Sequence, residues 1–105
     1  MPQFFLYKNA NKATQKNYPY LLDIQSNLLD DLRTTVVIPL MPKRLAGDHT
    51  ISKLNPVIKI RNKGFTVMTQ SLAGIDRNTL GAHVCDLIQY RSEIIAAIDF
   101  MLSGI

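Results

Sequence analysis

Residues 94–102 read IIAAIDFML, and Asp99 is the only polar side chain among them. Leu80, Leu87, Ile94 and Met101 follow one another at a constant spacing of seven residues. Apolar residues at this spacing predict one helix that runs from about Leu80 through this stretch. A surface helix normally has one apolar stripe, whereas the last turns here are apolar nearly all round. We therefore expect either a helix docked in its own core or one that also forms an interface.

The chain before this helix predicts short strands. Runs rich in apolar, aromatic or β-branched residues lie at Gln3–Tyr7, Tyr20–Gln25, Thr34–Leu40, Val57–Ile60 and Phe65–Gln70. The sequence RNKG at 61–64 predicts a hairpin between the last two runs. Pro39 is expected to end its strand at a bulge or an edge. The pattern favours an α+β or mainly β fold of antiparallel strands followed by one helix.

The overall composition is ordinary for a globular chain. The chain has 105 residues and is 47% hydrophobic, so we expect one domain spanning residues 1–105. No apolar run approaches the roughly 20 residues that span a bilayer, and the start of the chain lacks the basic leader of a signal peptide. We interpret Cys85, the single cysteine, as a half-buried apolar residue of the helix rather than a nucleophile. These features favour a reducing cytoplasm.

The net charge of +4 is unevenly distributed. Residues 84–105 carry a net charge of −2, so the remaining 83 residues carry +6. A basic body of this kind favours nucleic acid or an acidic protein as a partner. Its bases are scattered singly, however, and Lys43-Arg44 is the only adjacent pair. A solvated face therefore remains the first interpretation of the charge alone.

The motifs of common catalytic sites are absent from the sequence. His49 and His83 lie far apart and do not have the spacing of metal ligands. There is no glycine-rich phosphate loop and no hydrolase motif. The adjacent carboxylates Asp30 and Asp31 lie in a turn, where acids are usually just solvated. We therefore expect no catalytic residue, no metal, no cofactor and no enzymatic activity.

Two loops precede the strand at Thr34. Residues 8–17 read KNANKATQKN, without an apolar anchor, and we expect this loop to be mobile. Leu28 and Leu29 lie in a turn beside Asp30. A loop dileucine is either a hydrophobic plug beneath the loop or an exposed contact, and the plug is the first interpretation.

Several segments together resemble the CcdB toxins of bacterial toxin–antitoxin pairs. They are YLLDIQS at 20–26, LLD at 28–30, VIPL at 37–40, RL at 44–45, PV at 56–57, MT at 68–69 and the final run from Val84 to the terminal Gly-Ile. The resemblance covers essentially the whole chain. It implies a small SH3-like antiparallel β-barrel of the CcdB/MazF type with a C-terminal helix, and a homodimer.

The resemblance also implies a function. Toxins of this family bind the A subunit of DNA gyrase and trap its covalent cleavage complex with DNA, without being catalysts. A CcdA-like antitoxin, acidic and with a disordered C-terminal region, neutralises them. The toxin–antitoxin complex represses its own operon, so DNA is a partner only indirectly, through the antitoxin, and no membrane is involved.

The family's contact residues carry over by position. The gyrase contacts fall on Ser26, Leu28, Leu29, Asp99, Leu102, Ser103, Gly104 and Ile105, with the dileucine loop beside the carboxyl end. The antitoxin contacts fall on Tyr7, Lys8, Lys43, Arg44, Thr50, Phe65 and Met68, and the dimer interface on Ile24, Ile98, Met101 and Ile105. Ser103 departs from the family pattern, because the reference sequence has a tryptophan there as its main stacking surface.

Two other functions stay open beside the gyrase poison. An mRNA-cleaving toxin of the MazF/PemK type shares the same barrel, but this chain has no G-x-x-R-P motif. A degenerate toxin that binds only its antitoxin would be consistent with Ser103, because interface energy concentrates in a few aromatic or arginine anchors.

Overall fold

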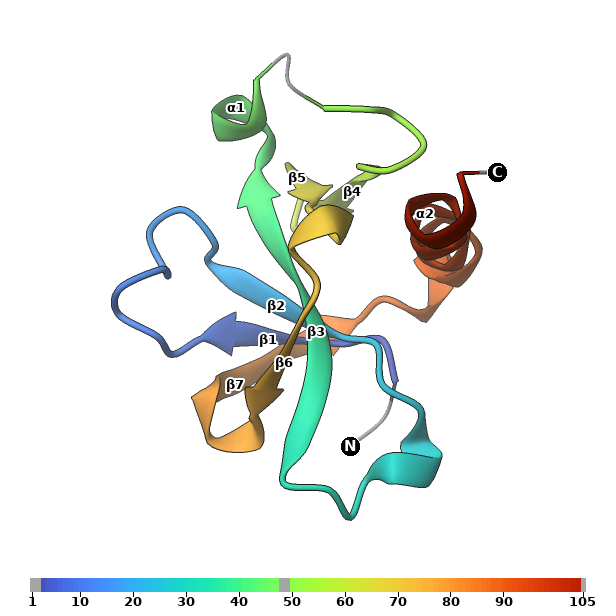
Figure 1. Ribbon diagram of the computed structural model, residues 1–105. Helices are drawn as coiled ribbons and strands as arrows, with labels where there is room; N and C mark the ends of the chain where they lie inside the picture. The colour runs from blue at the N-terminus through green and yellow to red at the C-terminus, as the bar shows by residue number, and fades with distance from the viewer. Residues whose placement is uncertain (1–2, 48–49, 105) are drawn as a thin grey trace.

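The strands form one curled antiparallel sheet, and the C-terminal helix lies beside it (Figure 1). The computed structural model describes residues 3–47 and 50–104. The seven strands are β1 (Phe5–Asn9), β2 (Tyr20–Asp23), β3 (Thr34–Pro42), β4 (Val57–Ile60), β5 (Lys63–Val67), β6 (Ala73–Asp76) and β7 (Leu80–Asp86). The helices are α1 (Lys43–Ala46) and α2 (Arg91–Ser103), with short 3₁₀ turns η1 (Asn27–Leu29), η2 (Thr69–Ser71), η3 (Arg77–Thr79) and η4 (Ile88–Tyr90).

The long strand β3 organises the sheet. The strand order is β4-β5-β3-β2-β1-β7, and β6 pairs with the first half of β3. One edge of β3 therefore contacts β2, while the other contacts β6 from Thr34 to Val37 and β5 from Leu40 to Pro42. Because β3 changes partners along its length, the sheet curls around the core into a half-barrel, in agreement with the expected small barrel with a C-terminal helix.

The core fills the inside of the curl. Most of its fully buried side chains come from the strands: Leu6, Leu22, Ile38, Leu40 and Val67. Phe4 adds to them just before β1, Leu87 in the segment that leads into α2, and Ile94 from α2 itself. Helix α2 is held by one face, on which Ile94 and Ala97 are completely buried. The burial of these side chains, at roughly 25 cal/mol per Å² of apolar surface, is what docks the helix.

The predicted helix is wrong in its first half. Leu80–Asp86 is strand β7, which pairs with β1 through Leu6↔Cys85 and Phe5↔Asp86. Leu80 begins this strand and Leu87 follows it, so the two residues do not lie on one helix. Backbone pairing with β1 therefore overrides the helical spacing of the apolar residues. Cys85 is therefore a strand residue and not a helical one. It is half-buried, and burial raises the pKa of its thiol, which disfavours the thiolate.

Two turn predictions had different outcomes. The hairpin is confirmed, with positive φ at Arg61 (52°) and Asn62 (67°) rather than at the glycine that follows. Pro39 does not end its strand. Its carbonyl accepts a hydrogen bond from the Met68 N–H at 3.0 Å. N–H and C=O of one strand residue point the same way, so the missing donor of Pro39 faces the gap between β6 and β5.

Candidate functional site

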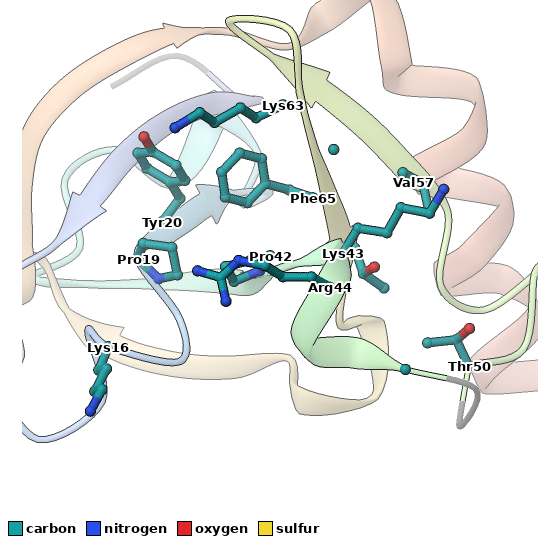
Figure 2. Close-up of a pocket in the computed structure, with 13 residues that line it drawn as sticks. Lys16, Pro19, Tyr20, Pro42, Lys43, Arg44, Thr50, Val57, Lys63 and Phe65 are labelled. Carbon is teal, nitrogen blue, oxygen red and sulfur yellow. The ribbon is translucent and has the colours of Figure 1, made fainter.

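A basic groove lies between the β1–β2 connection, α1 and the β4–β5 hairpin (Figure 2). Its volume is about 910 Å³. Four cationic side chains, Lys16, Lys43, Arg44 and Lys63, line it, and no carboxylate is among the described lining residues. The remaining lining residues are Pro19, Tyr20, Pro42, Gly47, Thr50, Val57, Gly64, Phe65 and Thr66.

The wall of the groove is apolar. The Tyr20 and Phe65 rings meet edge to face, with centroids 5.1 Å apart. Pro42 and the partly exposed Val57 extend this wall (Figure 2). A ring pair of this geometry is worth about 0.5–1.5 kcal/mol beyond its burial, so it also holds β2 against β5. The cationic rim would attract a negatively charged polymer, and the apolar wall would bury an apolar side chain that this polymer carries.

A second hollow continues the groove toward β1. It has a volume of about 380 Å³ and shares Lys16, Pro19 and Tyr20 with the groove. Lys8 lines its far side, so the cationic surface runs on from the groove to β1. The side-chain amide of Asn9 donates to Thr14 Oγ1 and to the Tyr18 carbonyl, each at 2.9 Å. These bonds anchor the polar loop that forms the wall of the hollow.

The structure brings together most of the predicted antitoxin residues. Lys43, Arg44, Thr50 and Phe65 line the groove, and Lys8 lines the adjoining hollow. Tyr7 and Met68 line neither. Tyr7 is buried and contacts the His83 ring, with centroids 5.7 Å apart. Burial raises the pKa of the Tyr7 hydroxyl, and the carboxylate of Asp23 raises it further.

Sequence reasoning missed three of the six charged and aromatic residues that line the groove. Lys16, Tyr20 and Lys63 were not among the candidate residues, although each lines the groove. They come from segments that meet only in the folded sheet, and a single lysine in a polar loop carries no signal of its own. The neighbouring Lys43-Arg44 pair was the one local signal of the site.

The end of α2 is exposed. Leu102 retains 76% of its exposure, and Asp99, Ser103 and Gly104 are also exposed. The Ser103 hydroxyl donates to the Asp99 carbonyl at 2.7 Å. Gly104 adopts a left-handed φ of 73°, and its N–H donates to the Phe100 carbonyl at 2.8 Å. This residue therefore ends the helix as its C-cap. Ile105 lies outside the described residues.

The dileucine turn is exposed and does not form the expected hydrophobic plug beneath the loop. Leu28 is 93% exposed and Leu29 is about half exposed. Ser26, the third candidate in this turn, caps η1 by accepting a hydrogen bond from the Leu28 N–H at 3.2 Å. Figure 1 places η1 at the lower right and the end of α2 at the upper right. The turn therefore does not lie beside the end of α2, contrary to expectation.

The remaining predictions concern the dimer interface, a metal site and a membrane-spanning segment. Ile24 and Ile98 are half-buried against the core, and Met101 is half-buried on α2. Of the two histidines, His83 is exposed on β7, and His49 lies outside the described residues. In residues 3–47 and 50–104 no His, Cys, Asp and Glu side chains gather as metal ligands would. Within the same ranges, no helix is long and apolar enough to cross a membrane.

Two comparisons with known proteins agree with this architecture. The protein family described as CcdB protein matches residues 3–104. Among solved structures, the chain is similar to an endoribonuclease in complex with its cognate antitoxin from a mycobacterial species. That similarity has a TM-score of 0.75 at 14% identity and covers 97% of this chain and 95% of the other. At this identity the likeness concerns the fold, and it confirms the expected barrel with a C-terminal helix.

Proposed function

The chain belongs to the CcdB family, and from this we propose that it is the toxin of a toxin–antitoxin pair. It binds the A subunit of DNA gyrase, traps the covalent complex between gyrase and cleaved DNA, and is neutralised by an acidic antitoxin. The observation that carries the proposal is the family match, which extends over nearly the whole chain. Because gyrase acts on the chromosome, the protein would work in the cytoplasm.

The basic groove is the proposed antitoxin site. Lys16, Lys43, Arg44 and Lys63 supply positive charge around the wall formed by Tyr20 and Phe65. An acidic, disordered segment gains charge pairs at this rim and burial at the wall, and both offset the entropy lost on ordering. DNA is then bound only by the complex of toxin and antitoxin. The lysine and arginine residues elsewhere on the chain are scattered singly, which is consistent with this indirect role.

The proposed gyrase site combines the end of α2 with the dileucine turn. Leu28 and Leu102 are the two most exposed large apolar side chains of the described chain. Such residues stabilise a complex when a partner covers them. The two sites are apart within one subunit, so we propose that a homodimer, formed through the Ile24, Ile98 and Met101 surface, brings the turn of one protomer toward the α2 of its partner.

Three observations bear on the endoribonuclease alternative. The similarity of fold to an endoribonuclease favours it, as does a groove rich in cations. Against it, the described lining residues include no histidine and no carboxylate. These are the usual groups that move protons in hydrolysis. A gyrase poison needs no such group, because gyrase itself performs the cleavage.

The test uses purified gyrase, supercoiled plasmid, ATP and the toxin. Linear DNA that appears after the enzyme is denatured indicates a trapped cleavage complex and supports the proposal. Cleavage of RNA by the toxin alone, with gyrase left out, would support the ribonuclease instead. A toxin that does neither but binds its antitoxin would be the degenerate member of the family.

A further inference from the structure

Arg77 fastens the dileucine turn to the sheet from a distant part of the chain. Its Nε donates to the Leu32 carbonyl at 2.7 Å, and its Nη2 donates to the Leu29 carbonyl at 3.3 Å. Its backbone N–H donates to the Arg33 carbonyl at 2.9 Å. One residue at the start of η3 therefore binds three carbonyls of the segment that follows Leu28.

The charge of Arg77 is held by two carboxylates. Nη1 lies 3.9 Å from Asp23 Oδ2, and Nη2 lies 4.0 Å from Asp30 Oδ1. Asp23 is 1% exposed, and its Oδ1 accepts hydrogen bonds from Thr35 Oγ1 at 2.8 Å and from the Gln25 N–H at 3.1 Å. Asp23 is thus fixed within β2, and Arg77 connects the exposed turn to a buried anchor in the sheet.

These contacts of Arg77 bear on how far the apolar side chains of the turn are exposed to solvent. Leu28 is almost fully exposed, and Leu29 and Leu32 are about half exposed. Water favours a collapsed turn that hides such side chains. The bonds from Arg77 hold the Leu29 and Leu32 carbonyls in place, so the turn stays open with Leu28 outward. A turn that is already ordered loses less entropy when it binds a partner.

We propose that Arg77 is a positioning residue for the dileucine turn, and that it holds Leu28 in the geometry that gyrase recognises. The inference rests on the proposed function, in which Leu28 contacts the gyrase A subunit. Arginine is needed because its planar group offers five donors in a fixed fork. A lysine at this position keeps the charge beside Asp23 but cannot serve both carbonyls and both carboxylates.

The experiment compares Arg77→Lys with Arg33→Lys, which makes the same change at an exposed arginine of the same segment. Amide hydrogen exchange over residues 27–33 should accelerate about tenfold or more in Arg77→Lys and stay unchanged in Arg33→Lys. Affinity for the gyrase A subunit should fall about tenfold in Arg77→Lys. Antitoxin affinity should be unchanged, because the basic groove does not include this turn.

A second pair of variants tests whether Arg77 acts through Leu28. In a Leu28→Ala background, Arg77→Lys should have little further effect on gyrase affinity, because the side chain that it positions is gone. Fully additive losses, or unchanged exchange over residues 27–33, would overturn the inference. If the wild-type protein does not bind gyrase, the proposed function fails, and the exchange measurement alone still decides whether Arg77 orders the turn.

Discussion

The rings of Tyr20 and Phe65 meet edge to face at 5.1 Å, and this contact joins two strands that are far apart in the chain. It brings the lysine-bearing β1–β2 connection opposite the β4–β5 hairpin. The four cations of the groove are consequently a product of the fold and not of a basic run in the sequence.

Charge reversal in the groove should slow the association of the antitoxin. In Lys43→Glu and Arg44→Glu the field that attracts an acidic segment is weakened, so the on-rate should fall about tenfold or more at low salt. Both side chains are exposed, and the fold should remain intact. Lys53→Glu is the matched control, because Lys53 lines a separate hollow beside α2. Stopped-flow rates that do not change between low and high salt would contradict the electrostatic account.

The protein should be a homodimer with an isologous interface. Met101 is half-buried and Leu102 is exposed on a helix that one core covers on only one face. Met101→Asp should therefore weaken the dimer, because it places a carboxylate in the proposed interface. Ser92→Asp makes a comparable change in the exposed first turn of the same helix and should have no effect. A single 11.8 kDa species of the wild-type protein in sedimentation at micromolar concentration would refute the prediction.

The carboxyl group of Asp23 should make stability depend on pH. Burial raises its pKa above the ordinary 3.8, and the hydrogen bonds from Thr35 and Gln25 and the charge of Arg77 oppose this effect. The folded protein therefore binds this proton more tightly than the unfolded chain does. The resulting stabilisation is complete below the unfolded-state pKa and is lost as pH rises through the folded-state pKa.

Asp23→Asn removes this titration while leaving an oxygen that accepts from Thr35. The free energy of unfolding of the wild-type protein, relative to the variant, should decrease as pH rises from below the unfolded-state pKa of Asp23 through its raised folded-state pKa. Denaturant unfolding at each pH measures it, and the exposed Asp31→Asn serves as control. A difference that is constant, or that increases with pH, would contradict the assignment.

Much of the sheet could be predicted because its signals are local. The hairpin at Arg61 and Asn62 and the β-branched β3 both follow from neighbouring residues. The helix boundary could not be predicted, because Leu80 and Leu87 share a helical spacing although β7 is fixed by pairing with β1. Likewise, nothing beside Arg77 in the sequence indicates that it binds carbonyls of a distant turn.

Removal of residues 103–105 should abolish toxicity while the protein still folds. Ser103 and Gly104 are exposed, so their loss costs no core side chain among the described residues. It costs the hydrogen bond from the Gly104 N–H to the Phe100 carbonyl and the one from the Ser103 hydroxyl to the Asp99 carbonyl. A reduction in stability of about 1 kcal/mol is expected. The truncated protein should bind antitoxin in the groove with unchanged affinity and should not be toxic. A growth assay with thermal unfolding tests this, and a truncation that stays fully toxic would place the target site elsewhere.

Ser103→Trp should strengthen binding to gyrase. Ser103 is exposed in the last turn of α2, where a larger side chain meets solvent rather than the core. If the target has the pocket that the family's tryptophan fills, the new ring should contribute about 1–3 kcal/mol to binding. That gain is about a fivefold to 150-fold increase in affinity for the gyrase A subunit.

The matched control for this change is Ser103→Ala. It removes the hydroxyl that donates to the Asp99 carbonyl but adds no ring, so it separates the loss of that bond from the gain of aromatic surface. Ser103→Ala should bind gyrase as the wild-type protein does, and both variants should keep their affinity for antitoxin. A Trp variant that binds gyrase no better than Ser103→Ala would show that this protein docks through other contacts, with Leu28 and Leu102 the first to test.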